Sequence, residues 1–246
     1  RPPRPPRAPQ CSSGRPLDLV LVFDHSGSMA PVQAQVLEFA RDLILALDFG
    51  SNAARVGLVE FDETATILSN LTHNVDTVLA ALASAPPAEG WTSISSGLSA
   101  GLTVLRAGGS GMRPKVLLVL TDGEQNQQFG GAALAIAHAA EVRAAGVEIF
   151  GVGFGGANPA TIAAISSEPA SLYAYTGTDM AAIRDHFRGR FCSLFLSPRA
   201  PPPPPPPPPA PPSVPVICLE TCTWASDAAC DDGGPGSEYP YCQYGT

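Results

Sequence analysis

The sequence is poor in charge and in long apolar segments. Only 15% of its 246 residues are charged while 45% are hydrophobic, a balance that excludes a fully disordered chain and allows one buried core of ordinary size. No apolar run approaches the roughly 18–20 residues that cross a bilayer, so we expect no membrane span in this sequence. Bases are also few, because 14 Lys and Arg stand against 22 Asp and Glu, a net charge of −8. This acidic balance argues against a nucleic-acid partner.

Cysteine is absent from the apolar middle of the chain. All six cysteines lie before or after it, at Cys11, Cys192, Cys218, Cys222, Cys230 and Cys242. An even number outside a core is typical of disulfides and of an oxidising compartment, although the spacing of Cys218 and Cys222 is also close to that of zinc ligands. The first residue is Arg rather than Met, so we expect a processed chain or fragment. We predict an extracellular protein, secreted or held in a cell wall or matrix.

Prolines divide the chain into modules. Residues 1–16 hold six of the 27 prolines and residues 198–215 hold thirteen, including an unbroken run at 201–209. Such a run donates no backbone hydrogen bonds and favours a semi-rigid polyproline II rod. The expected modules are a Pro/Arg-rich linker (1–16), an α/β domain (17–192), a polyproline linker (193–215) and a cysteine-rich module (216–246).

Short apolar runs alternate with segments of helical period between residues 17 and 192. This alternation predicts an α/β fold, a doubly wound, Rossmann-like and mostly parallel sheet with helices on both faces. The expected strands are 17–23, 55–61, 65–68, 115–120, 147–152 and 172–175, and the expected helices are 32–47, 75–83, 93–106, 132–145, 159–166 and 180–187. The second and third strands are too close for a crossover helix and should form a hairpin.

Oxygen-bearing side chains follow the ends of these strands. Asp24, Ser26 and Ser28 stand at alternate positions after the first strand, Asp122 follows the strand at 115–120, and Thr92 precedes a helix. Ligands of doubly wound sheets bind beyond the carboxyl ends of the strands, where the connection direction reverses. Two carboxylates and three hydroxyls are hard donors that leave room for water, which favours Mg²⁺ or Mn²⁺ over a tight calcium cage.

With these residues the chain resembles the von Willebrand factor A domains, over essentially all of residues 17–190. The likeness rests on Asp-x-Ser-x-Ser at 24–28, the loop threonine and Thr-Asp-Gly at 121–123, and continues in Val-Gly-Leu-Val at 56–59 and Gly-Val-Gly at 151–153. It implies a metal-ion-dependent adhesion site with Ser26, Ser28 and Thr92 as direct or near-direct ligands. Asp24 and Asp122 often act through water in that family. The resemblance implies an extracellular adhesion module whose metal bridges to an Asp or Glu of a matrix protein.

Trp91 stands beside the expected ligand Thr92, where many members of that family carry small residues. We expect Trp91 to contact a partner, with Phe129 adding apolar area, because tryptophan is enriched at interface hot spots. A ring packed on the loop as a lid is the alternative. His25, at a variable position of the first motif, is expected to face solvent rather than to bind the metal.

Three motifs suggest other chemistry. Residues 151–156 fit the dinucleotide pattern G-x-G-x-x-G but follow a late strand, and residues 97–101 fit the nucleophile elbow G-x-S-x-G but fall within an expected helix. A metal-dependent phosphatase of the haloacid dehalogenase type would use Asp24 and Lys115. That chemistry needs a second acid two residues after the nucleophile, where this chain has Ser26. We expect no enzyme, and the main alternative function is a structural cell-wall or matrix glycoprotein with the α/β domain as a passive spacer.

The tail is too short to build a core and must be stapled by disulfides. It resembles small cysteine-rich repeats of algal and protist extracellular proteins. We expect Cys11 to pair with Cys192, because they flank the α/β domain, and the tail cysteines to pair with one another in one of three ways. Asn70, in an Asn-Leu-Thr sequon, is expected to lie on an exposed loop and to carry a glycan.

Overall fold

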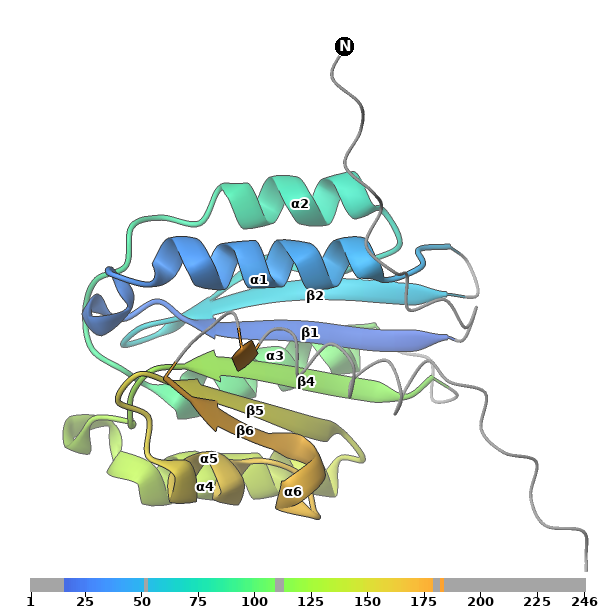
Figure 1. Ribbon diagram of the computed structural model, residues 1–246. Coiled ribbons are helices and arrows are strands. Elements are labelled where there is room, and N and C mark those ends of the chain that lie inside the picture. The colour runs from blue at the N-terminus through green and yellow to red at the C-terminus, as the bar shows by residue number, and fades with distance from the viewer. Residues whose placement is uncertain (1–15, 51–52, 109–112, 179–181, 184–246) are drawn as a thin grey trace, which may run out of the picture. The chain divides into compact units, whose positions relative to one another are not determined.

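A six-stranded sheet forms the centre of the domain (Figure 1). The computed structural model describes residues 16–50, 53–108, 113–178 and 182–183. The strands are β1 (Leu17–Asp24), β2 (Ala54–Phe61), β3 (Ala65–Thr72), β4 (Lys115–Thr121), β5 (Glu148–Phe154) and β6 (Ala174–Gly177), in the spatial order β3-β2-β1-β4-β5-β6. Only β3 is antiparallel to its neighbour. The mostly parallel sheet and its β2–β3 hairpin are confirmed.

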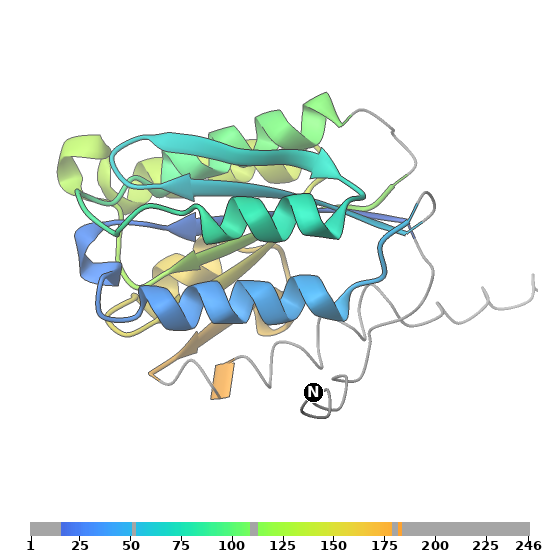
Figure 2. The same cartoon turned by 90° about the horizontal axis from the view of Figure 1, so that it is seen from above.

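Helices cover both faces of the sheet, as Figures 1 and 2 show together. They are α1 (Gln33–Ala46), α2 (Val75–Ala83), α3 (Ile94–Ala107), α4 (Gly131–Ala144), α5 (Pro159–Ile165) and α6 (Ala170–Tyr173), with two short 3₁₀ helices, η1 (Gly27–Met29) and η2 (Gln127–Phe129). The doubly wound arrangement predicted by the hydrophobic pattern is therefore confirmed. Of the helices that the structure describes, none has both the length and the apolar character needed to cross a membrane.

Side chains of β1 alternate between two apolar cores. Leu19 and Leu21 pack with α1 and α2, whereas Val20 and Val22 pack with α3 on the opposite face. A strand buried on both faces reads as a continuous apolar run, which is why β1 was easy to predict. Its neighbours are β2 on one side and β4 on the other, so the chain connections diverge here. The topological switch point therefore lies at the carboxyl ends of β1 and β4.

Two expected elements differ in the structure. The expected strand at 172–175 is split, because the helical turn α6 ends at Tyr173 and β6 begins at Ala174. Asn70 was expected on a loop but lies in β3, the edge strand, where it is exposed. The second half of this edge strand was not predicted, because its polar residues interrupt the hydrophobic pattern. A strand of this kind exposes one face to solvent. The glycan on Asn70 stays a prediction.

Several expectations lie outside the described residues. They are the two proline-rich linkers, the cysteine-rich module, all six cysteines with their pairing, and the helix at 180–187 apart from residues 182–183. These remain predictions.

Candidate functional site

Asp24 ends β1 at the switch point and is only 1% exposed. Its Oδ1 accepts a 2.9 Å hydrogen bond from the backbone N–H of Ser26, and its Oδ2 accepts a 2.6 Å bond from the Thr121 hydroxyl. Both donors are neutral. Burial is the main reason why the pKa of Asp24 is raised to about 6. The hydrogen bonds from Thr121 and Ser26 lower this pKa in part, and the nearby charge of Asp122 adds a smaller rise. A carboxylate in this setting favours a cation beside it.

Two serines connect this aspartate to the end of β4. The Oγ atoms of Ser26 and Ser28 lie 3.2 Å apart, and Ser28 Oγ donates a 2.8 Å hydrogen bond to Asp122 Oδ1. The loop turns tightly here, because η1 begins directly after Ser26. Gly27 N–H also donates to the carbonyl of Gly90 at 3.0 Å, which attaches this loop to the loop before α3.

Thr92 occupies that second loop and is 6% exposed. Its N–H donates to Asn126 Oδ1 at 2.7 Å, and its carbonyl accepts from the Asn126 N–H at 3.0 Å. A Cβ atom built on Gly123 would lie 3.9 Å from Thr92 Oγ1, so the hydroxyl of Thr92 lies beside the turn that carries Asp122. The structure thus joins Asp24, Ser26, Ser28 and Asp122 in one network and sets Thr92 next to it.

The donor set suits a hard divalent cation. Across the described part of the chain, no three His, Cys, Asp or Glu side chains are grouped so as to hold a metal ion. A cation at this site would therefore depend on the serine and threonine hydroxyls together with the two aspartates. Oxygen donors of this kind suit Mg²⁺ or Mn²⁺.

Three supporting residues were missed from the sequence. Thr121 was noted only as part of its motif, yet its hydroxyl holds Asp24. Asn126 holds the Thr92 loop, and buried Gln125 accepts a 2.7 Å hydrogen bond from Ser95 N–H at the start of α3. The available signal was a pair of amide side chains just after Thr-Asp-Gly, in a segment expected to be a loop.

The prediction that His25 faces solvent was wrong, because the residue is 4% exposed. Its Nε2 lies 2.7 Å from Gln33 Nε2. Gln33 Oε1 accepts from Ala88 N–H and Gln33 Nε2 donates to the Pro86 carbonyl, so the amide nitrogen is the donor to His25 as well. In the neutral form of the ring, His25 Nε2 is then the acceptor.

Trp91 and Phe129 differ in exposure. Trp91 is 54% exposed, directly before Thr92, so about half of its surface is open to solvent. Phe129 is partly buried in η2.

The two glycine motifs have packing roles. A Cβ atom on Gly97 would lie 2.5 Å from Phe61 Cδ1, and one on Gly101 would lie 2.8 Å from a Leu117 methyl. Both glycines let α3 approach the sheet closely. A Cβ on Gly153 would lie 2.6 Å from Ile162, so this glycine lets α5 approach β5 closely. The nucleophile-elbow pattern falls inside α3, away from any strand-to-helix turn.

Lys115 lies at the wrong end of the sheet for a phosphatase. It begins β4 and pairs in register with Asp18, whereas Asp24 ends β1. Six residues of extended strand separate Asp18 from Asp24, a distance of roughly 20 Å. The chain therefore lacks the lysine that this chemistry would place near Asp24.

Comparison with known proteins agrees with this fold. Human (Homo sapiens) matrilin-1 is 34% identical over 166 residues, which are 63% of this chain and 32% of matrilin-1. Mouse (Mus musculus) matrilin-4 is 28% identical over 197 residues, which are 75% of this chain and 30% of matrilin-4. The chain thus spans about a third of the length of these relatives.

Solved structures give the same fold. Proximal thread matrix protein 1 from the mussel byssus, solved with a zinc-occupied MIDAS motif, superposes with a TM-score of 0.63 at 22% identity, over 75% of this chain and 47% of that one. The manganese-loaded TRAP protein of Plasmodium vivax gives a TM-score of 0.56 at 20% identity, over 70% and 72%.

The fold and the oxygen-rich switch point are those of a doubly wound binding domain. The profile of the von Willebrand factor type A domain matches residues 18–188, and the chain belongs to that family. Its kinship with the matrilins places it among extracellular proteins, which confirms the location predicted from the cysteines.

Proposed function

We propose that the chain is an adhesion module that holds Mg²⁺ or Mn²⁺ and presents it to an Asp or Glu side chain of a matrix protein. Asp24, Ser26, Ser28, Thr92 and Asp122 would hold the ion. The observation that carries the proposal is the hydrogen-bonded network from Asp24 through the two serines to Asp122. The zinc-occupied and manganese-loaded relatives support it.

The charge of the site favours an acidic partner. Two carboxylates balance a doubly charged ion, and the other protein donors are neutral hydroxyls. An ion held in this way keeps a position that water can leave. A hard cation prefers an anionic oxygen to water where the site is partly desolvated, since the interaction is less screened there. A protruding carboxylate of a partner is therefore the best occupant.

Trp91 would extend this contact beyond the metal. Its exposed ring stands on the loop that carries Thr92, so a partner bound at the metal would lie against it. Apolar area around a polar contact excludes water, and tryptophan is a frequent hot-spot residue. Phe129 is proposed to add a smaller area.

The test is capture of matrix proteins by the full chain with Mg²⁺ or with EDTA. We expect EDTA to abolish binding and Asp122→Ala to reproduce that loss. Asp122 is the better position for a variant, because Asp24 is buried and Asp24→Ala also perturbs the fold. Partner affinity that is unchanged in EDTA would defeat the metal bridge and favour the passive-spacer alternative.

A further inference from the structure

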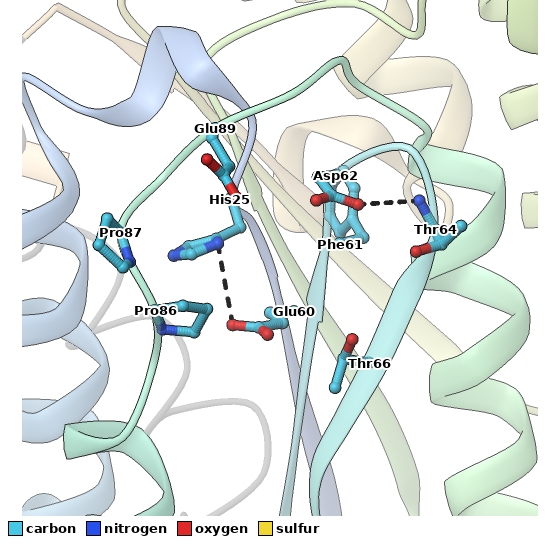
Figure 3. A pocket seen from close by; sticks show the side chains of 9 residues that line it. All are labelled: His25, Glu60, Phe61, Asp62, Thr64, Thr66, Pro86, Pro87 and Glu89. Atoms are coloured by element: carbon cyan, nitrogen blue, oxygen red, sulfur yellow. Dashed lines mark hydrogen bonds and ion pairs between the residues drawn. The ribbon is translucent and has the colours of Figure 1, made fainter.

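A small pocket of about 70 Å³ lies beside His25, directly after β1 (Figure 3). We call it the acidic pocket. Its lining comes from the end of β1, the β2–β3 hairpin and the loop between α2 and α3, and consists of His25, Glu60, Phe61, Asp62, Thr64, Thr66, Pro86, Pro87 and Glu89. Three of these residues are carboxylates and none is Lys or Arg. His25 is the one basic side chain of this lining, so the three carboxylates outnumber it and the lining is acidic.

Glu60 is the buried acid of this pocket. Its side chain is 10% exposed, and its Oε2 has no hydrogen-bond partner among the described residues. His25 Nδ1 lies 3.9 Å from this oxygen, which is close enough for an ion pair when the ring is protonated (Figure 3) but too far for a hydrogen bond. Burial raises the pKa of Glu60, the His25 ring opposes this, and Asp62 adds to it. A buried acceptor without a donor is uncommon in folded proteins and indicates a missing partner.

The acidic pocket is adjacent to the proposed metal site along two loops of the chain. His25 sits between Asp24 and Ser26 in the sequence, and it lines the pocket while those two neighbours belong to the metal site. Glu89 lines the pocket three residues before Thr92, and its N–H donates to the His25 carbonyl at 2.9 Å. One bound protein can therefore reach both places.

The wall of the pocket is preformed. Gln33 reaches from α1 to donate to the Pro86 carbonyl at 2.6 Å and to accept from Ala88 N–H at 3.2 Å, while it also holds the His25 ring. These contacts fix the segment that carries Pro86, Pro87 and Glu89. A rigid pocket loses little conformational entropy when a ligand binds.

The chemistry of the lining selects the ligand. Within the described residues, the carboxylates are not grouped tightly enough to hold a metal ion. They suit an organic cation with several N–H donors that can reach separate carboxylates. A guanidinium carries five N–H donors in a flat fork that suits carboxylates. Phe61 and the two prolines offer apolar area for the methylene stem of such a side chain, and Thr64 and Thr66 add polar groups.

We propose that the acidic pocket binds an arginine side chain of the partner whose carboxylate reaches the metal. The partner would then present an arginine and an acidic residue on one surface. The pairing of the two sites rests on the proposed function, whereas the affinity of the pocket for a guanidinium does not. The two are therefore tested separately.

The first experiment uses N-acetyl-arginine amide as the probe, on the full chain in EDTA, followed by amide NMR. We expect saturable shifts at Glu60, Thr66 and Glu89, and none with the neutral isostere N-acetyl-citrulline amide. Glu60→Gln should weaken binding about tenfold or more, because it replaces a charged acceptor by a neutral one. Glu89→Gln, at an exposed position, should weaken it as well, whereas Glu63→Gln, an equal change of charge outside the lining, should not.

Equal binding of the citrulline probe, or unchanged affinity in both Glu60→Gln and Glu89→Gln, would overturn the proposal. Because the measurement is made without metal, it stands even if the metal bridge is wrong.

The second experiment measures capture of the matrix partner. Glu89→Gln should lower partner affinity severalfold and leave Mn²⁺ affinity unchanged. Full partner affinity in this variant would contradict the pairing of the two sites.

Discussion

Ser28 Oγ donates a 2.8 Å hydrogen bond to Asp122 Oδ1, which lies 94 residues further along the chain. The parallel pairing of β1 with β4 brings these residues to the same edge of the sheet. The bond joins the loop after β1 to the turn after β4. A hydroxyl and a carboxylate in contact at a switch point are a prepared pair of oxygen ligands, and this pair is the basis of the first prediction.

Mg²⁺ is expected to stabilise the domain. A ligand that binds only the folded state raises the free energy of unfolding by about 2.7 kcal/mol when its concentration is 100 times Kd. We therefore expect the midpoint of chemical denaturation to rise with added Mg²⁺ and to return in EDTA. Asp122→Ala should show no such response, and an equal rise in that variant would place the ion elsewhere.

Trp91→Ala should weaken partner binding by about 1–3 kcal/mol, on the scale of interface hot spots. Its stability should change little, since the ring is 54% exposed. Leu134→Ala is the matched control, because Leu134 is an exposed apolar residue, 40% exposed, on α4. Partner affinity is measured in a surface binding assay, and stability is measured by denaturation. Equal affinities of Trp91→Ala and Leu134→Ala would remove Trp91 from the interface.

Asp18→Asn should destabilise the domain by about 3 kcal/mol, since it leaves two arginines without their buried partner. Asp18 is fully buried and accepts hydrogen bonds from Arg55 at 2.8 and 2.6 Å and from Arg113 at 2.6 Å. Urea denaturation measures the change. The exposed Glu63→Gln, which removes the same charge, should alter stability by less than about 0.5 kcal/mol. A similar loss in both variants would assign the effect to net charge.

Stability should fall at high pH partly through Tyr173. Burial, a 2.8 Å hydrogen bond to Glu148 and the charge of Glu148 together raise its pKa to about 12, and burial is the largest cause. The unfolded phenol, with a pKa near 10, loses its proton first, so the contribution is complete below pH 10 and is lost between about pH 10 and 12. Denaturation of Tyr173→Phe should show a shallower fall in this window. Identical pH profiles would show that the phenol is not perturbed.

The fold was predictable because its strands are buried on both faces. β1 and β4 contain the continuous apolar runs 19–23 and 116–120, and helical period marked α1 to α5. The candidate ligands could be predicted to lie close together because Asp24, Ser26 and Ser28 stand at alternate positions from the last residue of β1 onward. The turn α6 and the outer half of β3 were missed, because short or edge elements have weak apolar patterns.

The surroundings of the site were not predictable in the same way. His25 looked like a loop residue, and its burial depends on Gln33 and Glu60, which come from α1 and β2. Asn126 holds Thr92 across 34 residues. Such contacts are set by tertiary packing rather than by local pattern, so a single sequence gives no periodicity from which to infer them. The acidic pocket emerged for the same reason only from the structure.

Titration of the full chain with Mn²⁺ by calorimetry tests the central claim most directly. The account predicts one site that Ser28→Ala weakens and Asp122→Ala abolishes, and that Glu63→Gln leaves unchanged. Addition of a peptide carboxylate should then displace water from the bound ion, which lowers the Mn²⁺ contribution to water proton relaxation. Unaltered Mn²⁺ affinity in Asp122→Ala would contradict the assignment of the site to these residues.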